Sequence, residues 1–258
     1  MSNDRGPNLS SFAGRSIAVV GAGSGIGRAC AVHLASVGAS VACLDLDSNG
    51  SEQTAAEISG DGGVGWAGTI DVTQADSVTQ VMADTISTFG VLDGLLNTAG
   101  ITGVTNILTH EVDIDDFDRV YQVNVKGALL ITQAVIPHML EQGYGRILHI
   151  ASIAGKEGNA GMAAYSSAKA GLIGLVKTMG KEYAATGVTI NAMAPAVIQT
   201  PMVDAMPQAQ VDHLTDKIPM QRTGTLQEVA DMVTFALSPM CSFTTGFTFD
   251  LTGGRAVY

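Results

Sequence analysis

Two residues four positions apart, Tyr165 and Lys169, are candidates for acid–base chemistry. Positions i and i+4 lie on one face of a helix, so the ammonium group would stand beside the phenol. A phenol with a pKa of about 10 must have its phenolate favoured by about 3 pKa units, or roughly 4 kcal/mol, to act near pH 7. A nearby ammonium supplies part of that energy. The same spacing is also common on solvated helices.

Ser152 is a second candidate, because it directly follows the apolar run 147–151. This run is typical of a buried strand, and open α/β sheets bind their ligands at the carboxyl ends of strands. The hydroxyl of Ser152 is therefore placed to hydrogen-bond a substrate carbonyl.

A glycine-rich segment, 21–27, follows the first apolar run and leads into a helical pattern. Its spacing departs from the strict dinucleotide fingerprint, because Ile26 stands where the third glycine belongs. The physical requirements are still met. Gly21 permits a tight turn, Gly25 lets backbone amides approach a pyrophosphate, and Gly27 allows the helix to pack closely on the strand. In isolation, such a motif is also compatible with an ordinary glycine-rich turn.

Asp45 ends the next apolar run, close to the offset of about 20 residues at which an acid binds the adenosine ribose hydroxyls. A carboxylate there would repel a 2′-phosphate. Neither Ser24 nor Leu46 is a cation able to hold that phosphate. These residues favour NAD over NADP, although Asp45 alone is also compatible with a solvated turn.

Short β-branched runs alternate with Ala-rich segments of helical period. Strands are predicted at 16–20, 40–45, 64–69, 92–97, 146–150, 188–193 and 247–251. Helices are predicted at 26–37, 51–59, 77–89, 115–142, 165–186 and 226–237. This alternation indicates βαβ units, and hence a single-domain, Rossmann-like, doubly wound sheet of seven parallel strands with helices on both faces.

The domain is predicted to span 14–258, after a polar N-terminal extension, 1–13. The segment 194–224 interrupts the alternation with four prolines and no convincing strand. A long irregular insertion of this kind is typical of a substrate lid. Three methionines are predicted to give it a deformable apolar cover: Met202, Met206 and Met220.

Composition disfavours several classes of protein. The 13 basic and 24 acidic residues give a net charge of −11 without a basic run, which argues against nucleic-acid and anionic-membrane partners. Three separated cysteines without a CxxC pair favour a reducing compartment. The segment 1–15 lacks the apolar stretch of a secretory signal, and the apolar stretch 127–140 is too short for a membrane span. A soluble cytoplasmic protein is expected.

No metal site is expected. The five histidines are scattered singly, without metal-ligand spacing. The acidic residues between positions 111 and 118 have the composition of a metal cluster, but they surround a predicted helix start. Acids at that position stabilise the positive end of the helix dipole, so capping is the preferred interpretation.

Several separated motifs, in order and spacing, resemble the short-chain dehydrogenase/reductase family over residues 14–254. Four residues match its catalytic tetrad: Asn124, Ser152, Tyr165 and Lys169. The resemblance implies an NAD-dependent dehydrogenase acting on CH–OH groups. It also implies the following cofactor-binding residues: Gly21, Ser24, Gly25, Ile26, Asp45, Leu46, Asp71, Val72, Asn97, Ala99, Gly100, Tyr165, Lys169, Ala196, Ile198 and Thr200.

The resemblance assigns a role to each member of the tetrad. Tyr165 would remove the proton of a substrate hydroxyl while hydride passes from the same carbon to C4 of the nicotinamide. Ser152 would orient the hydroxyl and stabilise the developing oxyanion. Lys169 would lower the pKa of Tyr165 and bind the nicotinamide ribose. Asn124 would anchor a water for a proton relay behind Lys169.

Three departures from the family pattern stand near the cofactor. Val20 replaces a common Thr, which removes a side-chain hydrogen bond from the nucleotide turn. Thr98 replaces the usual second Asn of its motif. Ala196 replaces a Gly next to the nicotinamide side, where glycine is conformationally permissive and alanine is not.

The stretch 152–183 and the C-terminal tail are similar to the sugar-acid branch of the family. This similarity implies NAD-dependent oxidation at C4 of a 2-keto-3-deoxy sugar acid of the L-fuconate or L-rhamnonate type, as in L-fucose metabolism. The alternative within the family is a reductase of 3-oxoacyl thioesters or simple ketones, and Asp45 counts against it because such reductases commonly use NADPH. A third hypothesis is a catalytically silent nucleotide-binding regulator, because a fold alone does not prove activity.

An anionic sugar acid requires a cation or a cluster of donors in a mostly apolar cleft. Lys156 follows the catalytic strand, Arg222 lies near the end of the predicted lid, and Arg255 lies in the C-terminal tail. Asn159 and Gln199 are candidates for the sugar hydroxyls. Each of the five is also compatible with an ordinary surface position.

The family resemblance also implies a homotetramer. The predicted helices 115–142 and 165–186 would pack across subunits, and both are rich enough in Ala and Gly to approach closely. The expected partners are therefore further copies of the chain and a small anionic substrate.

Overall fold

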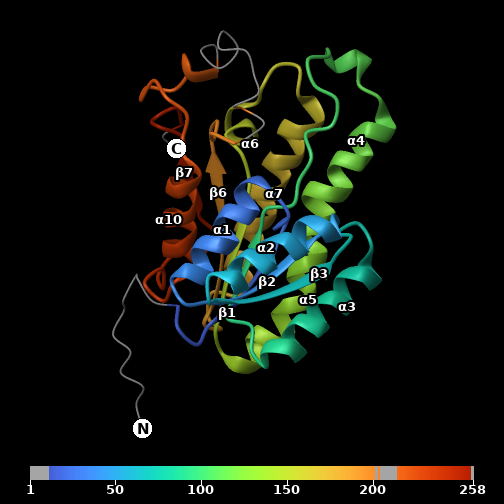
Figure 1. Ribbon diagram of the computed structural model, residues 1–258. Coiled ribbons are helices and arrows are strands. Elements are labelled where there is room, and N and C mark those ends of the chain that lie inside the picture. The colour runs from blue at the N-terminus through green and yellow to red at the C-terminus, as the bar shows by residue number, and fades with distance from the viewer. Residues whose placement is uncertain (1–11, 201–202, 204–213, 257–258) are drawn as a thin grey trace.

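The computed structural model of the protein describes residues 12–200, 203 and 214–256. Seven parallel strands form one sheet in the order β3-β2-β1-β4-β5-β6-β7 (Figure 1). They are β1 (Ser16–Val20), β2 (Ser40–Asp45), β3 (Val64–Thr69), β4 (Gly94–Asn97), β5 (Gly145–Ile150), β6 (Val188–Pro195) and β7 (Thr248–Leu251). The predicted doubly wound sheet is confirmed, and the first three strands begin and end at the predicted residues.

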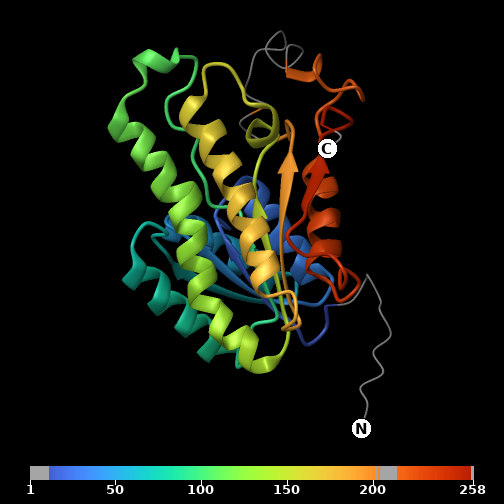
Figure 2. The same ribbon diagram turned by 180° about the vertical axis from the view of Figure 1, so that it is seen from behind.

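Helices cover both faces of the sheet. One layer contains α1 (Gly25–Ser36), α2 (Ser48–Gly60) and α10 (Leu226–Leu237). The other contains α3 (Ala75–Phe89), α5 (Gly127–Gln142) and α7 (Ala163–Glu182), which lie in front when the molecule is seen from behind (Figure 2). The predicted arrangement of helices on both faces is therefore confirmed.

The five inner strands contribute to two hydrophobic cores, because successive side chains point to opposite faces of a sheet. In β1, Ala18 and Val20 pack with the α3–α5–α7 layer. Ile17 and Val19 pack with the α1–α2–α10 layer. All four are fully buried, which explains why the strands have continuous apolar runs instead of alternating ones.

The sheet has a topological switch point beside β1. This strand pairs with β2 on one side and with β4 on the other, so the chain builds outward from it in two directions. In open α/β sheets, ligands bind in the crevice outside the carboxyl ends of the strands at such a point. The glycine-rich segment 21–27 and the segment 98–100 both begin there.

Two predictions about local structure were wrong. β6 continues into the predicted lid, where Ala194 and Pro195 pair with Asp250 and Leu251 of β7. Pro195 is tolerated because it is the last strand residue, and its carbonyl still accepts a hydrogen bond from the amide of Ile153. A short helix, α6 (Ala154–Glu157), follows Ser152 where none was predicted.

The predicted helix 115–142 is interrupted. It consists of α4 (Ile114–Tyr121), the π-helical turn η2 (Gln122–Lys126) and α5. By length and composition this 29-residue stretch, Ile114–Gln142, would suffice to cross a membrane, and 44% of its most apolar window is buried inside the protein. The core helices of globular proteins have the same properties, and here α4 packs on α7 and α5 packs on α3.

Candidate active site

A cavity of about 750 Å³, here called the nucleotide cleft, opens at the switch point. Eleven predicted cofactor-binding residues line it: Gly21, Ser24, Gly25, Ile26, Asp45, Leu46, Asp71, Val72, Ala99, Gly100 and Thr200. Gly21 adopts a φ of +87°, and a Cβ on Gly27 would collide with the carbonyl oxygen of Gly21. Both glycines are therefore required by the turn between β1 and α1.

The N-terminus of α1 faces this cleft without a cap. Ser24 is its N-cap residue but forms no side-chain capping bond, and the first turn carries no acidic residue. The free amides and the positive end of the helix dipole are thus available for an anion. The pyrophosphate of a dinucleotide fits this end of the helix.

Asp45 lies at the mouth of the cleft, and its carboxylate is held by backbone amides. Oδ2 accepts from the amide of Gly23 at 2.8 Å, and Oδ1 accepts from the amide of Asp47 at 3.0 Å. The negative charge is thereby fixed beside the nucleotide loop. This placement suits ribose hydroxyls and opposes a 2′-phosphate.

Thr98 compensates for the hydroxyl that Val20 lacks. Its Oγ1 donates to the carbonyl of Val20 at 2.8 Å and lies 3.1 Å from that of Gly21. The expected loss of a side-chain hydrogen bond at the turn is therefore offset from the neighbouring strand. The two departures from the family pattern are therefore in direct hydrogen-bond contact, which neither position reveals when it is considered alone.

A smaller cavity of about 250 Å³, here called the catalytic cavity, adjoins the nucleotide cleft. It contains Ser152, Tyr165 and Lys169, and its wall includes the predicted residues Ala196 and Ile198. Both cavities share Ile26, Thr98, Gly100, Ile101 and Thr200 as lining residues. Ile101 and Thr102, which also line the catalytic cavity, were not predicted.

The hydroxyls of Ser152 and Tyr165 are hydrogen-bonded to each other. Burial raises the pKa of Tyr165 above its usual value of 10, and the bond from Ser152 partly opposes this increase. Ser152 Oγ also accepts from the amide of Ala154 at 3.1 Å, so the first turn of α6 fixes its position. The pair is preorganised for binding a hydroxyl or carbonyl oxygen.

Lys169 is almost fully buried, and its Nζ donates to the carbonyl of Ile150 at 2.7 Å. Burial lowers the pKa of Lys169 to about 8. The ammonium lies 5.7 Å from the centre of the Tyr165 ring. The predicted i,i+4 proximity is therefore confirmed.

Asn124 lies in the π-helical turn, behind the other three residues. Its Nδ2 donates to the carbonyls of Ile101 and Val120, at 2.8 and 2.9 Å. Its Oδ1 is buried and lacks a hydrogen-bond partner within the described residues. A Cβ on Gly100 would meet this oxygen at 2.6 Å and Lys169 Nζ at 3.2 Å, so both groups face the same small space.

Asn97 was predicted to bind the cofactor, but it is not among the described residues that line either cavity. It is buried, and its Oδ1 accepts from the amide of Ala99 at 3.1 Å. The side chain therefore supports the wall of the nucleotide cleft from inside the sheet.

The predicted substrate cations each have an acidic partner. Lys156 Nζ donates to both carboxylate oxygens of Asp250, at 2.9 and 2.8 Å. Arg255 pairs with Glu157 at 2.8 Å and donates to Oδ1 of Asn159 at 3.2 Å. The structure thus brings Asn159 and Arg255 together beside α6. None of these residues is among those that line the catalytic cavity.

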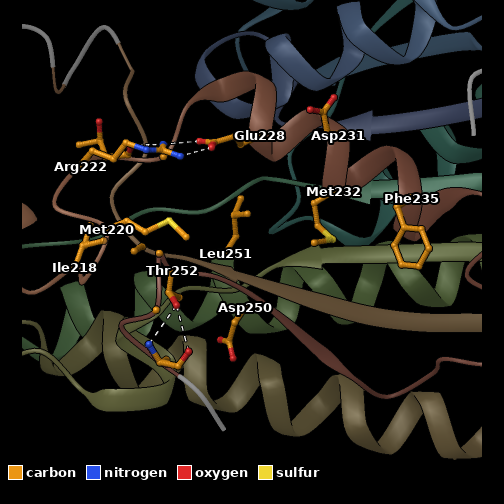
Figure 3. Close-up of a pocket in the computed structure, with 16 residues that line it drawn as sticks. Ile218, Met220, Arg222, Glu228, Asp231, Met232, Phe235, Asp250, Leu251 and Thr252 are labelled. Carbon is orange, nitrogen blue, oxygen red and sulfur yellow. Dashed lines mark hydrogen bonds and ion pairs between the residues drawn. The ribbon is translucent and has the colours of Figure 1, made fainter.

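Arg222 lines a third cavity of about 690 Å³, between α10, β7 and the segment 214–224. Figure 3 shows its guanidinium pointing toward Glu228, with which it forms a two-point ion pair. Gln199 lies close to Arg222, because its Oε1 accepts from the hydroxyl of the adjacent residue Thr223 at 2.7 Å. The same cavity is lined by Asp250, the partner of Lys156, and by Gly254 and Ala256, which flank Arg255, so it borders the Arg255 group.

The predicted lid is only partly described. Met202 and Met206 lie outside the described residues, and Met220 is 64% exposed. Ile198 forms a parallel bridge to Gly224, which ties the two ends of the segment together. Whether the segment acts as a lid stays a prediction.

The acidic residues at the start of α4 act as caps. Asp113 Oδ1 accepts from the amides of Asp115 and Asp116 at 2.8 and 3.2 Å. Asp116 in turn accepts from the amide of Val104 and pairs with Arg119, and both contacts lower its pKa. Within the described part of the chain, His, Cys, Asp and Glu form no group of three suited to a metal ion.

Comparisons with known proteins agree with this geometry. A family model described as enoyl-(acyl carrier protein) reductase matches residues 21–255. The chain is 43% identical over 247 residues to a 2-dehydro-3-deoxy-L-rhamnonate dehydrogenase (NAD(+)) of Sphingomonas sp. (strain SKA58), covering 96% of this chain and 97% of that protein. It is also 40% identical to a 3-oxoacyl-[acyl-carrier-protein] reductase of Synechocystis sp., covering 93% and 96% of the two chains.

The solved structure of an NAD⁺-bound xylitol dehydrogenase is similar as well, with a TM-score of 0.90 and 31% sequence identity over 94% of this chain and 99% of that one. The fold therefore agrees with that of the solved relative. The chain belongs to the short-chain dehydrogenase/reductase family and is an NAD-dependent oxidoreductase that acts on CH–OH groups.

Proposed function

We propose that the protein oxidises the C4 hydroxyl of a 2-keto-3-deoxy sugar acid of the L-rhamnonate or L-fuconate type, giving a diketo acid. The observation that carries this proposal is the 43% identity, over 96% of the chain, to the Sphingomonas rhamnonate-type dehydrogenase. The fixed carboxylate of Asp45 supports NAD as the partner of the reaction.

NAD supplies the hydride acceptor when it is bound. The substrate hydroxyl sits against the hydrogen-bonded pair of Ser152 and Tyr165. The phenolate of Tyr165 takes the hydroxyl proton, and Ser152 donates to the oxygen that develops carbonyl character. Both hydroxyls line the same cavity, which is continuous with the nucleotide cleft.

The role of Tyr165 as base requires stabilisation of its phenolate, because burial alone raises its pKa. Lys169 supplies a positive charge near the phenol, and it also reaches the nicotinamide ribose in this proposal. Asn124 Oδ1 anchors a water beside Lys169 for proton exchange with solvent. The unpartnered Oδ1 supports this assignment, since a buried amide oxygen without a partner is costly.

Recognition of the substrate carboxylate falls to one of three cations, Lys156, Arg222 or Arg255. We favour Arg255, because it already donates to Asn159 in the loop that leads into α7, the helix of Tyr165. Its side chain is 10% exposed, and Lys156, at 7%, is held by both oxygens of Asp250. Arg222 is 51% exposed and lines the third cavity instead. Asn159 and Gln199 remain candidates for the sugar hydroxyls.

The second candidate function is reduction of a 3-oxoacyl thioester. The 40% identity to the Synechocystis reductase and the description of the matching family model favour it. The two functions are expected to differ in cofactor preference, because 3-oxoacyl reductases commonly use NADPH and neither Ser24 nor Leu46 is a cation able to hold a 2′-phosphate. The discriminating quantity is therefore the ratio of activities with the two nicotinamide cofactors.

We also propose that the chain forms a homotetramer through α4, α5 and α7. Ile114 and Leu140, in this helical layer, are 68% and 38% exposed in the single chain. Burial of such side chains between copies would remove apolar surface from water. Light scattering after size-exclusion chromatography measures the mass of the assembly, and a monomer at micromolar concentration would contradict this part of the proposal.

The functional test is NADH or NADPH formation from NAD and NADP in parallel, with 2-keto-3-deoxy-L-rhamnonate, 2-keto-3-deoxy-L-fuconate, free sugars and simple secondary alcohols. The expected result is turnover of the deoxy-keto acids with NAD. Activity only with NADPH, in the reduction of an oxoacyl ketone, would overturn the substrate assignment and support the second candidate.

A further inference from the structure

A fully buried histidine, His149, lies beside the site, and the proposed mechanism does not use it. It is the penultimate residue of β5 and is in register with Asn97, the last residue of β4. Ile147 and Leu95, two residues earlier in each strand, pack in the α3–α5–α7 core. His149 and Asn97 therefore point into the same layer, below the wall of the nucleotide cleft.

The hydrogen bonds around these side chains have a fixed direction. The amide of Ala99 can only donate, so the oxygen of Asn97 must face it, as the 3.1 Å contact shows. The Nδ2 of Asn97 then faces Nδ1 of His149 at 3.2 Å and must donate to it. Nδ1 of His149 is therefore the acceptor and carries no proton.

The hydrogen bonds at the Thr132 end of this series impose the same direction. The hydroxyl of Thr132, on α5, donates to the carbonyl of Ala128 at 2.8 Å. Thr132 Oγ1 can therefore accept from Nε2 of His149, which lies 3.1 Å away. A donor-only amide and an acceptor-only carbonyl thus fix both ends, and only the neutral Nε2–H tautomer satisfies every bond between them.

The charge environment favours the same neutral form. A second proton, on Nδ1, would place two donors against each other at Asn97. Burial, assisted by the charge of Lys169 on α7, lowers the pKa of His149 to about 3. The histidine is therefore held neutral while Lys169 keeps its positive charge.

We propose that His149 is a positioning residue for NAD binding: as the neutral Nε2–H tautomer it connects Thr132 of α5 to Asn97, and through Asn97 it fixes the amide of Ala99. Ala99 and Gly100 line the nucleotide cleft, and Gly100 also lines the catalytic cavity. This series of hydrogen bonds from Thr132 through His149 to Asn97, here called the relay, thus sets the shape of a wall shared by cofactor and substrate. The proposal requires that the protein binds NAD, as in the proposed function, and does not depend on the identity of the substrate.

The first test observes the tautomer in the protein without cofactor. Long-range proton–nitrogen NMR of protein labelled with ¹⁵N-histidine distinguishes the two neutral tautomers and the imidazolium, and loss of the signal in His149→Asn assigns it. The expected result is a protonated Nε2 and an unprotonated Nδ1, unchanged from about pH 8 to about pH 5. A protonated Nδ1, or titration within this range, would overturn the proposal.

A substitution at Asn97 tests whether this side chain determines the tautomer of His149. In Asn97→Asp the carboxylate can only accept, so His149 must place a proton on Nδ1. The NMR spectrum should change to the Nδ1–H tautomer or to the imidazolium. An unchanged Nε2–H spectrum would show that Asn97 does not set the tautomer, and the relay would be refuted.

The second test measures NADH affinity by calorimetry. His149→Leu removes the acceptor for Asn97 and should weaken NADH binding about tenfold. His149→Asn places an amide oxygen near the Nδ1 position and should restore most of the affinity. His138→Leu is the matched control, because His138 is likewise a hydrogen-bond acceptor, in its case for the backbone amide of Leu92, but lies outside the relay.

Unchanged NADH affinity in folded His149→Leu, or an equal loss in His138→Leu, would contradict a positioning role. If His149→Leu does not fold, Thr132→Val tests the far end of the relay with a side chain of similar shape. It should weaken NADH binding by about two- to threefold and shift the Nε2 signal. No change in either quantity would contradict the proposal.

Discussion

The nucleotide cleft is built mainly from backbone at strand ends, whereas the proposed carboxylate-binding region is built from long charged side chains that distant segments supply. Gly21, Ser24 and Gly25 stand in one turn, and Asp45 joins them from the neighbouring strand. By contrast, the Lys156–Asp250 and Arg255–Glu157 contacts connect residues that are 94 and 98 positions apart.

This contrast implies that the two regions differ in how freely their residues can be substituted. The backbone of the cleft is fixed by the sheet and by glycines whose Cβ atoms would collide, so its ligand is constrained by the fold. The charged side chains near α6 are held mainly by one another, and of the two ion pairs only the Lys156–Asp250 pair includes a strand residue. Cofactor choice is thus expected to depend on few residues, and substrate choice on the balance of several ion pairs.

The largest expected effect is that of Tyr165→Phe. Removal of the hydroxyl that takes the substrate proton should reduce turnover by about a thousandfold, because acid–base catalysis contributes about 10²–10⁴-fold. NADH affinity, measured by calorimetry, should stay near that of the wild type, since the nucleotide cleft is unaltered. A loss of turnover below about tenfold would contradict the role of Tyr165 as base.

Asp45→Asn tests the cofactor side of the comparison. It removes the charge but keeps an oxygen that can accept from the amide of Gly23. The preference for NAD over NADP, measured as the ratio of kcat/KM values, should fall by about tenfold or more, or about 1.4 kcal/mol. Asp47→Asn is the control, because Asp47 caps α2 and does not line the cleft. An equal effect of both variants would refute the specific role of Asp45.

Two variants, Arg255→Gln and Glu157→Gln, test recognition of the substrate carboxylate. If Arg255 binds the substrate carboxylate, its neutralisation should raise KM by about tenfold. Glu157→Gln removes the resident acid of the ion pair and should lower KM or leave it unchanged. Lys156→Gln and Arg222→Gln measure the two alternatives. Near-normal KM values in all three cation variants would refute carboxylate recognition by these residues.

The last prediction concerns acid stability instead of activity. The pKa of His149 is about 3 in the folded protein, against 6.5 for an unperturbed imidazole, so between these values only the unfolded chain binds the proton. Stability should therefore fall as the pH is lowered through this window, by about 1.4 kcal/mol per pH unit from this group. Urea unfolding of the wild type and of His149→Asn should show this difference in slope. Parallel curves would contradict it.

The features that local pattern controls were predictable from the sequence. β1, β2 and β3 follow from apolar runs bounded by turns, and the nucleotide loop follows from glycine spacing. The placement of Tyr165 beside Lys169 follows from helical periodicity. Asp45 was found because it ends the second apolar run at about the 20-residue offset expected of a ribose-binding acid, and it lines the cleft.

The features that depend on distant partners were not predictable. The continuation of β6 to Pro195 requires β7 as a pairing partner, and proline had argued against a strand. The hydroxyl of Thr98 compensates for Val20 across 78 positions. The acidic partners of Lys156 and Arg255 come from opposite ends of the C-terminal half, so the sequence could not show that both cations are paired.

The central claim is that hydride leaves C4 of a 2-keto-3-deoxy sugar acid for NAD. It is tested most directly with 2-keto-3-deoxy-L-rhamnonate that carries deuterium at C4, and with the matching L-fuconate, by mass spectrometry of the reduced cofactor. The account predicts that the deuterium appears in the NADH formed by the wild type and that Tyr165→Phe forms almost none. Reduced cofactor without deuterium, or no reaction with either acid, would contradict the claim.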